Sequence, residues 1–183
     1  MLLKVFLTCV LNFWQYFEKP THQKCQISET KFEKMKMERT RIGQKRLELN
    51  PQLFQEFMVK ITQNRNNFTG FSIVSSSDSI FIKTTLGEEI QLFDQILGFD
   101  HSHNKEEKIQ QIAKKYDLDL NQIIYITDTA TDILELEGVL PKVNIFGVDW
   151  GYQGATKLAE FLSENQLLWN FEDFERLILI LKN

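Results

Sequence analysis

Residues 123–133 read Ile-Ile-Tyr-Ile-Thr-Asp-Thr-Ala-Thr-Asp-Ile, and this stretch decides the fold. Its first five residues are mostly apolar and β-branched, which predicts a buried strand followed directly by Asp128. A helix is expected from about Ala130 to Glu137, so Asp132 lies one helical turn beyond the strand. In a parallel α/β sheet the carboxyl ends of the strands face the ligand crevice. Asp128 is therefore expected at the sheet edge where binding sites form.

Two carboxylates at such an edge have two interpretations. Asp128 and Asp132 can converge on one point and hold Mg²⁺, a hard cation that prefers oxygen ligands and is completed by water and substrate phosphate. Alternatively, Asp128 caps the helix and Asp132 is a solvated acid in its first turn, where a negative charge suits the helix dipole. The spacing alone leaves both interpretations open.

The sequence around this stretch, from about Phe71 onward, alternates short apolar runs with helical periods. This alternation is typical of βαβ units and predicts an α/β fold, a Rossmann-like and mainly parallel sheet flanked by helices. Strands are expected at 71–74, 95–99, 123–127, 143–148 and 167–169, and helices at 78–86, 104–116, 130–137, 155–162 and 171–181.

The N-terminal end is an apolar run from Leu2 to Trp14. It predicts a first strand leading into a helix. The run is too short to cross a bilayer and lacks the small-residue cleavage pattern of a signal peptide, although a targeting segment is the alternative. We therefore expect a soluble protein.

Residues 13–65 are charged and rich in helix-forming residues, and Asn50-Pro51 predicts the start of an amphipathic helix that ends before Asn64. Between Lys31 and Arg46 there are seven basic residues and two acids. This charge pattern indicates a solvated helix whose apolar residues pack inward, with a phosphate- or nucleic-acid-binding face as the alternative.

The composition of the 183 residues, 43% hydrophobic and 25% charged, is that of one globular domain with room for a small insertion. The net charge of −4 gives no field that would attract nucleic acid or an anionic membrane, so an anionic ligand must be held by local groups. Cys9 and Cys25 are too few for a disulfide framework or a zinc site, which favours a reducing cytoplasm.

Two further features suggest chemistry. Ser75 and Ser76 follow an expected strand and precede an expected helix, where hydroxyls and backbone N–H groups can cradle a phosphate, although serines cap helices in many proteins. Lys105 lies in the first turn of its helix, where a cation opposes the macrodipole. An ordinary surface lysine is the simpler explanation of that residue taken alone.

Order and spacing combine these signals. A strand followed by Ser75, a helix opened by Lys105 and a strand followed by Asp128-x-x-x-Asp132 resemble the second, third and fourth motifs of the haloacid dehalogenase (HAD) superfamily of hydrolases. The flanking segments Asn-Lys-Glu-Glu-Lys-Ile, Tyr-Ile-Thr-Asp-Thr-x-x-Asp-Ile and Val-Asp-Trp-Gly-Tyr resemble its core in the same order. The late Asn-Phe-Glu-Asp-Phe-Glu-Arg-Leu resembles the closing helix of its phosphoglycolate-phosphatase-like members.

The resemblance implies a role for each matching residue. Ser75, with Ser76, would bind the phosphoryl oxygens, and Lys105 would neutralise their charge. Lys108, one turn further along the same helix, is a second candidate for the phosphate lysine. Asp128 and Asp132 would hold Mg²⁺ directly or through water. Thr127 departs from the family pattern, which usually has glycine there, and it brings a side chain close to the site.

The first motif of that family, a strand ending in Asp-x-Asp, has no counterpart here. It supplies the attacking carboxylate and the acid that protonates the leaving group. The expected strand contains no acid, and residues 1–70 contain six glutamates and no aspartate. Cys9 falls near the expected place, but no neighbour in the sequence could serve as its activating base.

The resemblance therefore implies a Mg²⁺-dependent phosphomonoester phosphatase that acts on a small phosphorylated metabolite, but whose nucleophile is lost through a truncated or misassigned N-terminus. The alternative is a catalytically inactive protein that binds a phosphate ligand or a protein partner. The expected organisation is a degenerate first strand at 1–12, a helical cap-like segment at 13–65 and a HAD-like core at 66–183.

Overall fold

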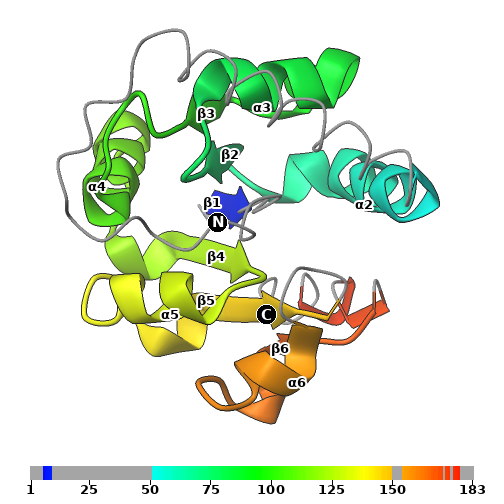
Figure 1. Ribbon diagram of the computed structural model, residues 1–183, viewed down its shortest axis with the longest axis vertical. Coiled ribbons are helices and arrows are strands. Elements are labelled where there is room, and N and C mark those ends of the chain that lie inside the picture. The colour runs from blue at the N-terminus through cyan, green and yellow to red at the C-terminus, as the bar shows by residue number, and fades with distance from the viewer. Residues whose placement is uncertain (1–5, 10–50, 150–153, 171, 174, 178–183) are drawn as a thin grey trace, which may run out of the picture.

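The structure, a computed structural model, describes residues 6–9, 51–149, 154–170, 172–173 and 175–177 (Figure 1). The positions expected for most of the cap-like segment and for much of the closing helix lie outside these residues. Within the part of the chain that is described, no helix is long and apolar enough to cross a membrane.

A single six-stranded sheet organises the chain, in the order β3-β2-β1-β4-β5-β6. Every pairing is parallel. The predicted α/β class with a parallel sheet is thus confirmed, and the strand predicted from Ile123 lies inside the sheet. The strands are β1 (Phe6–Cys9), β2 (Gly70–Val74), β3 (Gln95–Leu97), β4 (Ile123–Thr127), β5 (Ile145–Val148) and β6 (Leu167–Leu168).

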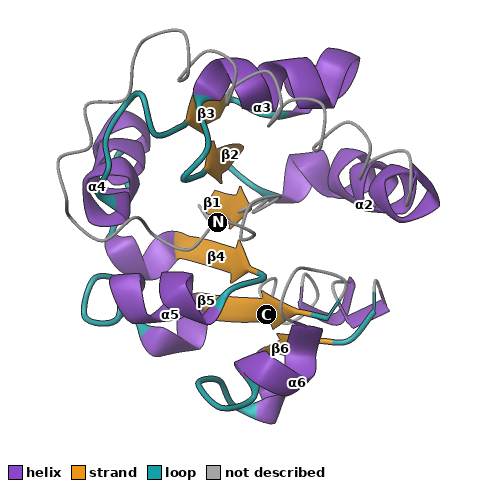
Figure 2. Cartoon of the chain, viewed as in Figure 1, coloured by secondary structure: helices purple, strands orange, loops and turns teal. Residues whose placement is uncertain are grey.

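Helices cover both faces of the sheet (Figure 2). Buried side chains of α2 (Pro51–Asn64) and α3 (Ser79–Leu86) pack in one core cluster. Those of α4 (Lys105–Tyr116), α5 (Ala130–Leu136) and α6 (Gly154–Leu158) pack in a second cluster on the opposite face. The two clusters make a three-layer arrangement with the sheet in the middle.

β4 shows why the sheet can be covered on both faces. Ile124 and Ile126 belong to the first core cluster, whereas Ile123 and Tyr125 belong to the second. Side chains alternate between faces along a strand, so a strand buried on both sides has to be apolar at nearly every position. The continuous apolar run in the sequence is the direct result.

The helix predicted from Pro51 is confirmed as α2, and it is part of the core. Phe57, Met58 and Ile61 are buried in the same cluster as residues of β2. The predicted boundary between a cap-like segment and the core, at residue 65, thus falls inside a packed unit. The cap assignment of the earlier residues stays a prediction.

Two short 3₁₀ turns, one directly before β4 and one directly before β6, each contain a capping box. Asp119 and Gln122 form a capping box before β4, and Ser163 and Gln166 form one before β6. The Gln166 amide also donates to the backbone oxygens of Lys142 (2.6 Å) and Ile145 (2.9 Å). A single side chain therefore joins β6 to the start of β5.

Replacing Gln166 with alanine leaves the backbone oxygens of Lys142 and Ile145 without this donor. We expect Gln166→Ala to lower the free energy of unfolding by about 1–3 kcal/mol, measured by urea denaturation. Gln122→Ala is the matched control. Among the described residues that partly exposed side chain bonds only within its own turn, so its effect should be smaller. Equal losses for both variants would contradict the bridging role of Gln166.

Candidate active site

The carboxyl ends of β2 and β4 frame the candidate site. Ser75 follows β2 directly and Asp128 follows β4 directly, and β1 lies between these strands. The sheet order reverses at β1, and such a reversal is where open α/β sheets bind ligands. Both predicted residues thus reach the same edge of the sheet, on either side of its central strand.

The register shows how far β1 extends toward this edge. Cys9, its last residue, is level with Ile73 on one side and Ile126 on the other. Ser75 and Asp128 each come two residues later in the chain, which is about 7 Å at the rise of a strand. Cys9 therefore lies below the level of the site, which weakens its candidacy as a nucleophile.

Ser75 is completely buried, and its surroundings fix its orientation. Its hydroxyl oxygen accepts a hydrogen bond from the backbone N–H of Ser77 at 3.0 Å, which leaves the hydroxyl proton for another acceptor. The Lys108 ammonium donates to the Ser75 carbonyl at 2.7 Å. Ser76, the second predicted phosphate ligand, is exposed at the tip of the same turn.

The turn that holds Ser75 is tied to the loop after β3. The backbone N–H and the hydroxyl of Ser79, at the start of α3, both donate to Asp100 at 2.8 Å. The Phe99 N–H donates to the Ser77 carbonyl at 2.8 Å. Burial raises the pKa of the Asp100 carboxyl, but the hydrogen bonds from Ser79, with smaller effects of the backbone N–H of Asp100 and of His101, hold this pKa below its usual value. Asp100 thus stays ionised and keeps the two loops together.

Lys105 pairs with two carboxylates of α5. Its ammonium contacts the Asp132 Oδ1 and lies 3.3 Å from the Glu135 Oε2. Lys105 is 4% exposed and Asp132 1%, so their contact is a buried ion pair. Sequence reasoning brought Lys105 and Asp132 to one site but missed Glu135, which follows Asp132 by three residues and shares its side of the helix.

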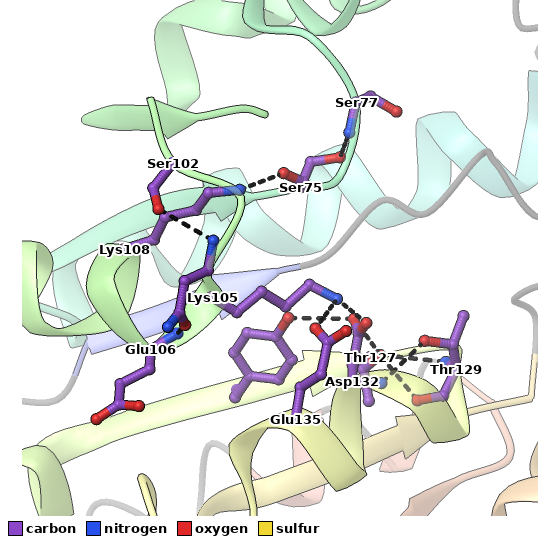
Figure 3. A network of polar contacts seen from close by, with 12 residues as sticks. Ser75, Ser77, Ser102, Lys105, Glu106, Lys108, Thr127, Thr129, Asp132 and Glu135 are labelled. Carbon is purple, nitrogen blue, oxygen red and sulfur yellow. Dashed lines mark hydrogen bonds and ion pairs between the residues drawn. The ribbon is translucent and has the colours of Figure 1, made fainter. Parts of the chain in front are cut away.

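The other carboxylate oxygen of Asp132 is held by β4. The Thr127 hydroxyl donates to the Asp132 Oδ2 at 2.9 Å, and the Tyr125 hydroxyl donates to it at 3.1 Å. Figure 3 shows the Thr127 side chain and the Lys105 ammonium converging on Asp132. Thr127 and Tyr125 can act together because residues two apart in a strand share a face. Thr127, predicted only to bring a side chain near the site, thus acts as a hydrogen-bond donor.

These contacts bear on the predicted metal site. Both Asp132 oxygens are already engaged, so a metal could replace Lys105 or the two hydroxyls only by breaking their bonds. Within the described ranges, no three His, Cys, Asp or Glu side chains come together as metal ligands. Asp128, 7% exposed, remains as a candidate oxygen ligand. This donor set does not fit a tightly held Mg²⁺, which favours several oxygens in octahedral geometry.

Lys108 is the second buried lysine of α4. Burial, together with the smaller effect of the nearby Lys105 charge, lowers the pKa of its ammonium from 10.5 to about 8, although Asp100 and Glu135 oppose the shift. The side chain is 1% exposed. The site therefore holds two buried cations on one helix, three residues apart.

Comparison with known proteins identifies the fold. No family profile matches this sequence, and no curated protein matches it. The structure is similar to a haloacid dehalogenase-like family hydrolase from Streptococcus pneumoniae, with a TM-score of 0.65 and 16% identity over 98% of this chain and 100% of that one.

Two further solved structures are similar over part of their length. A candidate phosphoglycolate phosphatase from Lactobacillus delbrueckii has a TM-score of 0.56 and 17% identity, over 66% of this chain and 51% of that one. A phosphatase domain from Bacteroides fragilis complexed with Mg has a TM-score of 0.51 and 10% identity, over 80% of this chain and 36% of that one. This chain thus spans about half of the first and about a third of the second. The expected HAD-like fold is confirmed.

The lowered pKa of Lys108 predicts a pH dependence of stability. Between about pH 8 and pH 10.5 the folded protein has lost this proton while the unfolded chain still binds it. Stability contributed by this group should therefore rise with pH across that window and fall as the pH drops through 8.

The measurement is the free energy of urea unfolding across the window for wild type and Lys108→Met. Subtracting the free energy of unfolding of the variant from that of the wild type cancels the titration of the groups that the two proteins share. We expect this difference to rise with pH across the window. Lys114→Met, at an exposed position of the same helix, should show the pH profile of the wild type. A difference that is constant with pH would contradict the lowered pKa.

Proposed function

We propose that this chain binds the phosphate group of a small phosphorylated metabolite at the carboxyl edge of the sheet, between the ends of β2 and β4. The observation that carries the proposal is the placement of two buried lysines of α4 beside that edge, one on Ser75 and one on Asp132. Buried ammonium groups in a protein of net charge −4 mark a local site for an anion.

The parts of the site match the needs of phosphate recognition. The Ser75 hydroxyl keeps its proton available, and the exposed Ser76 lies at the tip of the turn that leads into α3. The ammonium groups supply charge neutralisation, which is most of what a protein contributes to phosphoryl transfer. One of the similar structures is the candidate phosphoglycolate phosphatase, which is named for a small phosphorylated acid. It supports the same class of ligand.

Hydrolysis of a phosphomonoester is the reaction for which such a site is arranged, and the fold neighbours support it. Retention of the Lys105–Asp132 pair and of Asp128 favours this function. The sequence of β1 opposes it, because no acid precedes Glu18. Loss of a nucleophile costs about 10⁶ in kcat in a hydrolase. We therefore propose that this chain binds phosphate without ordinary turnover, and that a carboxylate after β1 is the missing part.

Leu11 is the position to test, because it follows Cys9 by two residues. Ser75 and Asp128 likewise come two residues after the strand residues that pair with Cys9. We expect the wild type to hydrolyse a generic phosphomonoester no faster than Ser75→Ala/Asp128→Asn. The double variant Leu11→Asp/Phe13→Asp, which creates Asp-x-Asp, should gain Mg²⁺-dependent turnover. A colorimetric phosphatase assay measures both.

The matched control is Leu11→Asn/Phe13→Asn, which is nearly isosteric with the acidic variant but has no nucleophile. It should stay at background. Turnover by the wild type that survives Cys9→Ala would show that a nucleophile lies elsewhere in the chain, and the binding-only proposal would then be wrong.

Mg²⁺ is proposed to bind weakly. With the Asp132 oxygens engaged, most coordination falls to water and to the phosphate itself, so we expect a dissociation constant of ~1 mM or weaker. Titration calorimetry with MgCl₂ should show heat for the wild type and less for Asp128→Asn. If neither protein shows heat of Mg²⁺ binding, helix capping is the favoured role of Asp128.

A cytoplasmic location, suggested by the two isolated cysteines, also stays a prediction.

A further inference from the structure

The Asp132 carboxylate is held by three hydrogen-bond donors, two from β4 and one from α4. Its Oδ2 accepts from the Thr127 hydroxyl at 2.9 Å and from the Tyr125 hydroxyl at 3.1 Å. Its Oδ1 contacts the Lys105 ammonium. Each oxygen of an ionised carboxylate has about two lone-pair sites. The two hydroxyls therefore saturate Oδ2, and a cation could bind there only by displacing one of them.

The Thr127 hydroxyl is itself fixed in its orientation. Its oxygen accepts the backbone N–H of Thr129 at 3.1 Å, so its single proton is left for an acceptor. Two acceptors lie within reach, the Asp132 Oδ2 at 2.9 Å and the Thr129 carbonyl at 3.5 Å. The closer one is charged, and hydrogen bonds to charged groups are the stronger ones. The proton is therefore directed at Asp132 (Figure 3).

Burial strengthens the contacts of both hydroxyls with Asp132. Tyr125 and Thr127 are 0% exposed, and Asp132 is 1% exposed. Bulk water therefore does not compete for the hydroxyl protons, and a hydrogen bond to a charge is stronger in such surroundings than in water. A hydroxyl displaced by a cation would lose this bond where water cannot replace it, so the displacement is costly.

We propose that Thr127 and Tyr125 withdraw Asp132 from metal binding, and that the Thr127 hydroxyl is the main determinant of weak Mg²⁺ binding at this edge of the sheet. The inference names the residues that make the donor set unsuitable for a tightly held cation. It rests on the proposed weak binding of Mg²⁺ at Asp128, and it does not depend on the binding of phosphate.

The size of the effect follows from the strength of the hydrogen bonds. A bond from a hydroxyl to a charged carboxylate corresponds to about 10–100-fold in an equilibrium constant. Thr127→Val keeps the branched shape but removes the hydroxyl, so it should tighten metal binding by about that factor. Tyr125→Phe should tighten it less, because its bond is longer. Thr127→Ser keeps a hydroxyl and should bind the metal as the wild type does.

The experiment is titration of the full chain with MnCl₂, followed by the electron paramagnetic resonance signal of free Mn²⁺, with MgCl₂ as a competitor. Mn²⁺ shares the preference of Mg²⁺ for oxygen ligands. We expect the gain in Thr127→Val to be lost again in Thr127→Val/Asp132→Asn. Thr84→Val makes the same change at an exposed position of α3 and should match the wild type.

Tyr125→Phe is the second variant, because Thr127→Val also leaves the Thr129 N–H without its acceptor. If Thr127→Val does not fold, Tyr125→Phe decides the question. If the folded variants bind Mn²⁺ no more tightly than the wild type, the hydroxyls do not keep the metal out and the inference is wrong. A wild-type dissociation constant for Mg²⁺ far below ~1 mM would overturn it as well.

Phosphate binding is measured on the same proteins by calorimetry with inorganic phosphate. A wild type that binds no phosphate would contradict the proposed function, whereas the comparison of Mn²⁺ affinities would still decide this inference.

Discussion

The buried ion pair between Lys105 and Asp132 is the interaction on which the site depends. It joins the start of α4 to the first turn of α5, and the hydroxyls of Thr127 and Tyr125 extend it into β4. Such a pair contributes little net stability, because both charges lose their hydration, but removal of one partner leaves an uncompensated charge that costs about 3–5 kcal/mol. The pair therefore determines where α4 and α5 lie relative to the sheet more than it determines how stable the protein is.

The topology of the site could be predicted from the sequence because strand ends are visible in it. The apolar run before Asp128 and the shorter one before Ser75 both end in polar residues, and the parallel sheet brings such ends to one edge. Which lysine serves which partner could not be predicted. Lys105 and Lys108 lie three residues apart on the same side of a helix, so their spacing predicts proximity to the site but not the direction in which each side chain extends.

Other local features were hidden for a different reason. β5 begins at Ile145, two residues later than the predicted 143, because residues 142–144 form a 3₁₀ turn. The Asn144 amide bonds the backbone oxygens of Asn121 and Ile123 across the sheet. The roles of Thr127 and Tyr125 could not be predicted either, because each is an ordinary strand residue in the sequence and its partner on α5 is distant along the chain. Long-range contacts of single polar side chains leave no periodic pattern in a sequence.

The tie between the Ser75 turn and the loop after β3 also affects the entropy of ligand binding. A phosphate-binding loop that is mobile in the free protein must be immobilised by its ligand, and part of the interaction energy is lost to that ordering. Here Asp100 holds the start of α3, and the Phe99 N–H holds the Ser77 carbonyl, before any ligand arrives. The turn is thus ordered by folding itself, and a small anion with few atoms can bind without having to organise the backbone around it.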